Sequence, residues 1–440
     1  MSAASTGLAR RLGARDATLI VMGGIVGSGI FMNPAVVARR VPSTPLILAV
    51  WLFGGLVAIA GGMVFAELAR RRPGVGGMYG YLRDAFHPVV AFMSGWTALL
   101  VSMSGAIAAT AVTFAQYAAP YLHADTRYTA IAAIVVLSGV NCLGVRESVS
   151  AQNALMIVKI VTIGGIIAAG LLVPHGAVAP AAGTLLPATG VMLVGALGAA
   201  LLPVFYSYDG WQTAPFMDRE LRDPAVTLPR GLLFGVAGVV LLYVLMTFAG
   251  LHTLGAAGLA ASQAPATDIV ARAIGPSAQL LLAACIAVST LGFLGNMALT
   301  IPRLYHAMAA DGLFFKQLAY VHPKTRAPVV AIWMQAVISI AILLSGKYDQ
   351  ILNYVTSMDF LWMVLCAIAL GVFRARDGMK RAPWAGYGFA AVSAAVVINS
   401  YVAFPGDTLA GLAILLSGAP VYWIWTRWGS ARPTISPRSV

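Results

Sequence analysis

The sequence predicts an all-α polytopic membrane protein with about 12 transmembrane helices. The 440 residues are 60% hydrophobic and only 10% charged, and their mean hydropathy is +0.85. Soluble domains carry about 25% charged residues, so the composition excludes an ordinary soluble protein. Apolar runs long enough to cross a bilayer recur along the chain. We expect spans at residues 17–38, 46–68, 88–120, 128–145, 151–174, 190–216, 231–252, 268–300, 327–345, 349–373, 384–403 and 406–426.

The first predicted span is interrupted near its start by the segment Gly23-Gly24-Ile25-Val26-Gly27-Ser28-Gly29-Ile30-Phe31. Each glycine costs a helix about 1 kcal/mol relative to alanine, so we expect the helix to break here. In the bilayer core, unpaired backbone N–H and C=O groups are tolerated only where protein or a water-filled cavity covers them. A broken span therefore predicts a binding site. The alternative is close helix packing through the small-residue spacing Gly23-x-x-x-Gly27.

The backbone chemistry of such a break suits an amino-acid zwitterion. The half-helix after it begins near Ser28, Gly29 and Ile30, whose free N–H groups and partial positive charge favour a carboxylate. The half-helix before it ends in free carbonyls, such as that of Ile25, which favour a cation or an ammonium group. One break thus offers both halves of a site.

The net charge of +13 reflects the orientation of the chain in the membrane. With the N-terminus in the cytoplasm, the basic residues that fall outside are Arg39, Arg40, Arg127, Arg272 and Lys347. Apart from Lys159, all other arginines and lysines fall inside. This asymmetry predicts a multi-pass protein of the inner or plasma membrane with both termini cytoplasmic. The same asymmetry explains the net positive charge of the chain, so we expect no nucleic acid as a partner. We also expect no removable signal peptide before the first span.

Lys159 is an ionisable residue inside the fifth predicted span. Insertion of such a charge at a helix centre costs about 2.5–3.5 kcal/mol, so a functional role is the default hypothesis. The alternative is snorkelling of the side chain to the cytoplasmic end. At 1.5 Å per residue, Lys159 lies about 8 Å from Ala154 and about 20 Å from Arg146 along the helix. The shorter distance barely permits snorkelling and the longer one forbids it, so we favour function.

The sixth predicted span repeats the anomaly of the first. Its apolar run contains two tyrosines, an acid and a glycine in Pro203-Val204-Phe205-Tyr206-Ser207-Tyr208-Asp209-Gly210-Trp211. We expect a second break in this segment. The two interrupted spans are five apart, which indicates inverted repeats with a binding site between them. A proline kink with interfacial aromatic residues is the alternative.

Three more polar residues fall within apolar spans. Ser289 and Thr290 either bond to their own helix backbone or face the first span and Lys159. Asp359, in the tenth span, is either neutral and hydrogen-bonded or close to the aqueous end of its helix.

We expect no metal and no cofactor. Cys142, Cys285 and Cys366 have the spacing of neither a metal site nor a disulfide framework, and free cysteine usually packs as a small hydrophobe. The histidines are scattered, and no His-Glu-x-x-His motif occurs. An intramembrane enzyme would need clustered catalytic residues. A sensor would need a soluble signalling domain, for which residues 427–440 are too short, so we favour a transporter over both classes.

Several motifs follow one another along residues 15–330. They are Gly27-Ser28-Gly29-Ile30-Phe31, Glu67-Leu68 with Pro73 and Gly76-Gly77-Met78-Tyr79-Gly80-Tyr81, Asp209-Gly210-Trp211, Glu220-Leu221-Arg222-Asp223-Pro224 with Leu228-Pro229-Arg230, and Arg303-Leu304-Tyr305-His306-Ala307-Met308-Ala309-Ala310-Asp311-Gly312-Leu313-Phe314 with Val321-His322-Pro323-Lys324. As a set they resemble the amino acid, polyamine and organocation (APC) transporter superfamily, most closely its L-type amino acid transporter branch.

The resemblance implies the LeuT-type fold, a five-plus-five inverted repeat with broken first and sixth helices. A cytoplasmic tail would cover residues 1–14 and a transport core residues 15–373. Within the core, one repeat would span about 15–175 and the other about 188–373. Two additional helices would occupy 384–426, followed by a cytoplasmic tail at 427–440.

The resemblance also implies the residues of the site. The substrate-binding residues are Ile25, Gly27, Ser28, Gly29, Tyr206, Ser207 and Asp209. The substrate carboxylate would meet the N–H groups after the break, and the amine would meet carbonyls of both interruptions. An aromatic residue four positions before the Gly-Trp pair closes over the substrate in the family. That position is Tyr206, whereas the phenylalanine common in relatives falls one place earlier, at Phe205, so the gate is one of the two.

Sodium-coupled relatives hold a cation between the first and eighth spans, and the resemblance suggests that the ammonium group of Lys159 fills that place near Ser289. It implies a sodium-independent transporter of amino acids, working as an exchanger or a proton symporter. Because Asp209 is the only acid near the breaks, we favour neutral L-amino acids over cationic amino acids or polyamines. The loop after the third span, residues 120–127, has no cysteine, so we expect no disulfide-linked accessory subunit. The other expected partner is the lipid bilayer.

Overall fold

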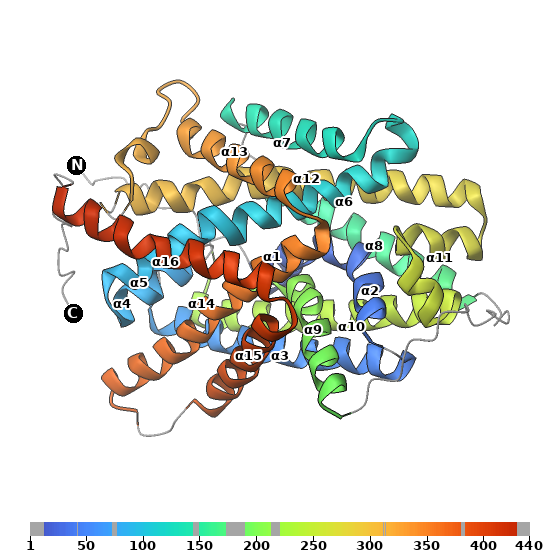
Figure 1. The fold of residues 1–440 in the computed structure, drawn as a ribbon, viewed down its shortest axis with the longest axis horizontal. Coiled ribbons are helices and arrows are strands. Elements are labelled where there is room, and N and C mark those ends of the chain that lie inside the picture. The colour runs from blue at the N-terminus through green and yellow to red at the C-terminus, as the bar shows by residue number, and fades with distance from the viewer. Residues whose placement is uncertain are drawn as a thin grey trace.

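The structure is a computed structural model that describes residues 13–41, 43–72, 77–143, 149–172, 190–212, 221–310, 312, 314–379 and 383–428. Helices make up almost all of the regular structure in these ranges (Figure 1). The helices are α1 Ala14–Ile25, α2 Gly29–Arg40, α3 Thr44–Arg71, α4 Gly77–Ala85, α5 Pro88–Thr97, α6 Met103–Leu122, α7 Thr126–Cys142, α8 Val149–Leu172, α9 Gly190–Tyr208, α10 Pro224–Ala261, α11 Pro265–Ala273, α12 Pro276–Ala310, α13 Val329–Ser345, α14 Tyr348–Arg376, α15 Trp384–Ala403 and α16 Pro405–Trp428. A π-helical turn, η1 Ala98–Ser102, joins α5 to α6, and a 3-10 turn, η3 Lys316–Ala319, precedes α13.

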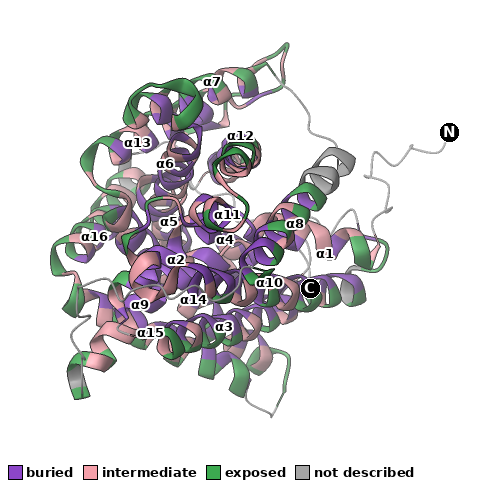
Figure 2. Ribbon diagram, turned by 90° about the vertical axis from the view of Figure 1, so that its right-hand side faces the viewer, coloured by how far each residue is buried: buried purple, intermediate pink, exposed green. Residues whose placement is uncertain are grey.

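The described helices are those of a polytopic membrane protein, as the composition predicts. Seven spans are long and apolar enough to cross a bilayer, and α1 with α2 passes the same test as one bent pair. Shorter apolar helices lie in α7, α8, α9 and α13. In Figure 2 the exposed residues line the outer faces of the bundle, whereas α2 and α14 lie inside it and are mostly buried.

Two predicted spans have different bounds in the structure. The predicted span at 268–300 is divided, because Gly275 has a φ of +119° and precedes Pro276, which disfavours continuation of α11 into α12. The helix predicted at 190–216 ends at Tyr208, where the second break was expected. The continuation to residue 216 and the motif residues Pro73, Gly76, Glu220, Asp311 and Leu313 lie outside the described residues, as do residues 1–12 and 429–440.

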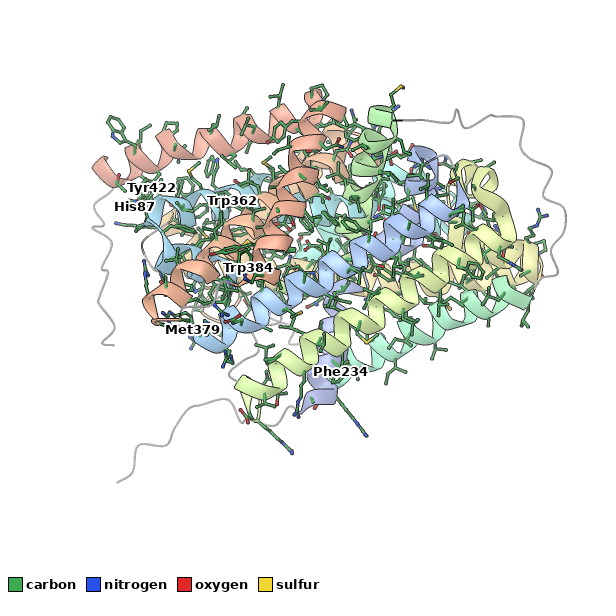
Figure 3. The ribbon with its side chains drawn as sticks, turned by 90° about the horizontal axis from the view of Figure 1, so that it is seen from below. His87, Phe234, Trp362, Met379, Trp384 and Tyr422 are labelled. Carbon is green, nitrogen blue, oxygen red and sulfur yellow. The ribbon has the colours of Figure 1, made fainter. Side chains whose placement is uncertain are left out.

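One helix, α14, is held by polar contacts at both ends. At its carboxyl end, Glu67 of α3 accepts from Arg71 and from Arg374, and Arg71 also pairs with Asp377 at 2.7 Å. Hydrogen bonds from Arg71 and then Arg72 hold the pKa of Asp377 below its usual value. In Figure 3 Met379, just beyond α14, lies at the same side of the molecule as His87 and Tyr422.

At the other end of α14, the last residues of α2 supply the contacts. Arg39 pairs with Asp349 at 3.3 Å, and Arg40 donates to the side-chain oxygen of Asn353 at 3.0 Å. Arg40 also donates to the carbonyl of Ala199 in α9 at 2.7 Å. The end of α2 is thereby tied to both α9 and α14.

The contact between α1 and α10 depends on glycine. A Cβ atom at Gly231 would lie 2.6 Å from the Cβ of Ala17 and 3.1 Å from its backbone carbon. A Cβ at Gly235 would lie 2.6 Å from Val21. Because helices approach this closely only where a side chain is missing, the glycines of α10 fix where α1 lies.

We therefore predict that Gly231→Ala lowers the thermal unfolding midpoint of the purified protein in detergent. The added methyl group overpacks the contact with Ala17, which typically costs about 1–3 kcal/mol. The matched control is Gly164→Ala in α8, where the added atom meets nothing within 4 Å. That variant should unfold at the wild-type temperature or slightly above it, because alanine favours helix by about 1 kcal/mol. Equal midpoints for Gly231→Ala and the wild type would contradict the prediction.

Candidate functional site at the break between α1 and α2

The first span breaks where the glycines predict it. α1 ends at Ile25 and α2 begins at Gly29, and the two helix axes are bent by 49°. Across the gap, the N–H group of Gly27 turns back to the carbonyl of Ile25 at 2.8 Å. The N–H groups of Ser28, Gly29 and Ile30 have no acceptor among the described residues. The start of α2 therefore presents the unpaired N–H groups and the partial positive charge that favour an anion at a helix end.

Lys159 of α8 lies against this break. Its Nζ atom donates to the carbonyl of Val26 at 2.9 Å, and the side chain is only 7% exposed. The same Nζ atom lies 4.8 Å from the centre of the Phe293 ring of α12, within the range of a cation–π contact. Lys159 therefore does not snorkel to an aqueous surface. It supplies a positive charge to a backbone carbonyl that no helix satisfies.

The two hydroxyl residues of α12 differ in their contacts. Thr290 donates to the carbonyls of Ile286 and Ala287 in its own helix. Ser289 is buried, and its hydroxyl has no partner among the described residues. Ser289 is one helical turn from Phe293 and shares its face, so it lies on the side of α12 that approaches Lys159. Thr290 thus bonds to its own helix backbone, and a role of Ser289 beside Lys159 stays a prediction.

The carbonyl of Ile25, expected to meet an amine, already accepts two hydrogen bonds. One comes from the N–H group of Gly27, and the other comes from the hydroxyl of Tyr243 in α10 at 3.3 Å. A carbonyl oxygen has two lone pairs, so both are used in this conformation. An amine reaches Ile25 only by displacing Tyr243.

The end of α9 meets the break directly. Gly210, in the turn after α9, has a φ of +119°, and a Cβ there would lie 2.1 Å from the carbonyl oxygen of Gly24. A Cβ at Gly29 would lie 2.8 Å from the Oγ atom of Ser207. Only glycine permits either approach. The two interruptions predicted from distant parts of the sequence therefore touch each other.

Phe205 and Tyr206 point to different surroundings, since successive helix residues differ by about 100°. Phe205 is 1% exposed and stacks on Phe360 of α14, with ring centres 4.3 Å apart. Tyr206 is less buried and packs against a different cluster, which includes Ile107 of α6 and Leu294 of α12. The hydroxyls of Ser28 at the start of α2 and Thr110 of α6 are 3.3 Å apart. Phe205 and Tyr206 thus pack against different parts of the bundle.

Sequence reasoning missed Asn33 as a residue of this site. Its amide nitrogen donates to the carbonyl of Pro203 and to the Oγ atom of Ser207, both at 2.8 Å. Its amide oxygen accepts from the hydroxyl of Tyr348 in α14 at 3.2 Å. Asn33 thereby joins three helices. The sequence did contain a signal for this role: Asn33 stands next to Pro34 in an apolar run. The polar amide group of such a residue needs hydrogen-bond partners inside a bilayer.

Asp359 is 5% exposed and lies near the middle of α14. It therefore does not lie close to the aqueous end of its helix, and whether its carboxyl group is neutral stays a prediction. Within the described residues, no group of three or more His, Cys, Asp or Glu residues has the geometry of a metal site.

The chain was compared with known proteins. A family model described as "Amino acid permease" matches residues 12–424. The Serine/threonine exchanger SteT of Bacillus subtilis (strain 168) is 29% identical over 441 residues, which cover 96% of this chain and 98% of that protein. The b(0,+)-type amino acid transporter 1 of Mus musculus is 29% identical over 84% of this chain and 77% of its own length. The Large neutral amino acids transporter small subunit 2 of Homo sapiens is 28% identical over 96% of this chain and 81% of its own length.

The match to the family spans nearly the whole chain, and the relatives are membrane transporters and not enzymes. It agrees with the order of motifs noted in the sequence and with the broken helix at which they begin. The chain belongs to the amino acid permease family of the APC superfamily, and it is similar to L-type transporters within it.

Proposed function

We propose that this chain is a sodium-independent secondary active transporter of neutral L-amino acids. It works by alternating access, as an exchanger or a proton symporter. The observation that carries the proposal is the break between α1 and α2, where free N–H groups face inward and the ammonium group of Lys159 already occupies the carbonyl of Val26. A site that holds its own cation at this position needs no sodium ion.

In this proposal the substrate carboxylate binds the N–H groups of Ser28 and Gly29 and the hydroxyl of Ser28, with Gly27 at the edge. The dipole of α2 favours an anion there by about 0.3–1 kcal/mol or more in a buried setting. We assign the gate to Tyr206 and not to Phe205, because Phe205 stacks on Phe360.

The amine of the substrate faces the carbonyls at the end of α9, at Tyr206, Ser207 and Asp209. Ile25 joins them when Tyr243 releases its carbonyl. Release of Tyr243 from Ile25 would therefore accompany substrate binding. The hydroxyl of Ser289 adds an acceptor near the ammonium group of Lys159.

We extend the proposal to the architecture of the whole chain. It has twelve spans with both termini cytoplasmic, and residues 15–175 and 188–373 form the inverted repeats. Residues 384–426 add two helices outside the repeats, and the protein lies in the inner or plasma membrane. One relative is named a small subunit. Since residues 120–127 contain no cysteine, this chain acts without a disulfide-linked partner.

A cationic amino acid or polyamine is the second candidate substrate, because Asp209 is an acid close to the break. We favour neutral substrates because a cationic side chain would need an acid in its pocket, and Asp209 is the only acid near the two breaks in the sequence. The name of the serine/threonine exchanger points the same way for that protein.

We predict that proteoliposomes loaded with unlabelled L-threonine take up labelled L-threonine or L-leucine faster than protein-free vesicles do. Replacement of sodium by choline should leave the rate unchanged, because Lys159 holds the cation position. Labelled L-arginine should enter at a rate at least about tenfold lower, which corresponds to about 1.4 kcal/mol. Sodium dependence, or a preference for arginine, would contradict the proposal.

We also predict that Lys159→Met lowers this counterflow at least about tenfold. Loss of the ammonium group leaves the carbonyl of Val26 unpaired, at a cost of about 1–3 kcal/mol. Lys316→Met, at an exposed position of η3, is the control and should transport as the wild type does. Wild-type counterflow in Lys159→Met would show that the charge at the break is dispensable.

A further inference from the structure

A groove opens on the outer face of the bundle between α3 and α10, far from the break between α1 and α2 in its chemistry. Its volume is about 280 Å³, and its apolar lining is Gly62, Met63 and Ala66 of α3 with Pro229 and Leu233 of α10. Both helices are long and apolar enough to cross a bilayer.

The residues around this groove are exposed although they are apolar. Met63 is 51% exposed and Leu233 is 46% exposed. Phe234, next to Leu233, is 60% exposed and lies at the outer edge of the bundle in Figure 3. Apolar side chains exposed on a membrane span are covered by lipid. The groove therefore faces the lipid that surrounds the protein.

The groove has an apolar end and a charged end. Gly62, Ala66 and Arg70 all line it, and they follow at intervals of four residues on one face of α3, over about 12 Å. Arg70 belongs to the last turn of α3, so the charged end is the one near the membrane surface. One leaflet has about 15 Å of hydrocarbon, half of the 30 Å core. The groove thus has the length of the upper part of one acyl chain.

Two exposed arginines lie at the charged end. Arg70 lines the groove, and Arg230 directly follows the lining residue Pro229, about one helical turn before Leu233. The ion pairs found among the described residues include neither arginine. A guanidinium group binds phosphate oxygens through paired N–H donors. The end of the groove therefore offers donors that suit a phosphate group.

The nearby acidic residues do not cancel this positive charge. Glu67 also lines the groove, but its carboxylate pairs with Arg71 at 2.8 Å and with Arg374 at 2.6 Å. Before the start of α10, the exposed Asp223 is next to the exposed Arg222. Each acid has a basic neighbour of its own, and the two arginines of the groove give its mouth a net positive charge.

We propose that this groove binds an anionic phospholipid. The phosphate group lies between Arg70 and Arg230, and one acyl chain fills the groove down to Gly62. Basic residues at a membrane surface attract anionic headgroups, whereas the ammonium group of a zwitterionic lipid opposes that attraction. In the orientation proposed above, the lipid belongs to the cytoplasmic leaflet.

A lipid in this position joins the two helices that support the broken span. It contacts α3 at Arg70 and α10 at Arg230, and Gly231, the next residue of α10, lies against Ala17 of α1. A ligand that binds the folded chain and not the unfolded chain raises the stability of the fold. Bound anionic lipid therefore stabilises the protein.

Native mass spectrometry of the purified full-length protein tests the headgroup. The wild type should bind its first phosphatidylglycerol about tenfold more tightly than phosphatidylcholine. Arg70→Gln and Arg230→Gln should each weaken phosphatidylglycerol binding about fivefold, the effect of one basic residue near an anionic headgroup. Arg303→Gln, at an exposed position of α12, is the matched control and should bind as the wild type does. Equal affinity of the wild type for both lipids, or wild-type binding by both groove variants, would overturn the proposal.

Gly62→Leu tests the acyl chain in the same assay. A Cβ at Gly62 meets only Val236, at 3.5 Å, so the longer side chain enters the groove. The variant should lose the preference for phosphatidylglycerol although both arginines remain. Gly164→Leu in α8, where an added Cβ meets nothing within 4 Å, should keep it. Wild-type binding by Gly62→Leu would contradict the placement of the chain.

Inorganic phosphate separates a lipid site from a site for a free anion. Phosphatidylglycerol should raise the thermal unfolding midpoint of the wild type in detergent, and the same concentration of inorganic phosphate should not. An equal rise with inorganic phosphate would show that the arginines bind the anion without a chain, and the proposal would fail.

Discussion

The contact between Lys159 and the carbonyl of Val26 is the interaction on which the rest of the site depends. A helix broken inside a bilayer exposes backbone groups that water cannot reach, and each unpaired group costs several kcal/mol. At Val26 the cost is met by a buried ammonium group, and at Ile25 by Tyr243. The amides of Ser28 and Gly29 remain open. The protein thus satisfies the carbonyl side of the break itself and leaves the amide side for a ligand.

Glycine places the other components around this break. Gly210 and Gly29 let the end of α9 touch the backbone of α1 and α2, and Gly231 lets α10 approach α1. Asn33 then ties α2 to α9 and α14 through hydrogen bonds. Each of these contacts joins the broken helix to a neighbour, so α9, α10 and α14 together hold α1 and α2 in place.

The sequence was sufficient to predict an all-helical membrane protein and the break at residues 26–28, and it singled out Lys159, which lies buried against that break. These follow from local propensity and from the cost of charge in a bilayer. It was insufficient for contacts that arise only when distant helices pack. The hydrogen bond from Tyr243 to the carbonyl of Ile25 and the one from Tyr348 to Asn33 are of this kind. The break at Gly275 was missed although the following Pro276 is a local signal, since the surrounding apolar run was interpreted as one span.

The most direct measurement is a cryo-electron microscopy structure of the full chain in a lipid nanodisc with L-threonine bound. The account predicts the amino acid carboxylate about 2.7–3.2 Å from the amide nitrogens of Ser28 and Gly29. It also predicts that the ammonium group of Lys159 remains on the carbonyl of Val26. Density for the amino acid away from the break, or Lys159 paired with the substrate carboxylate, would contradict it.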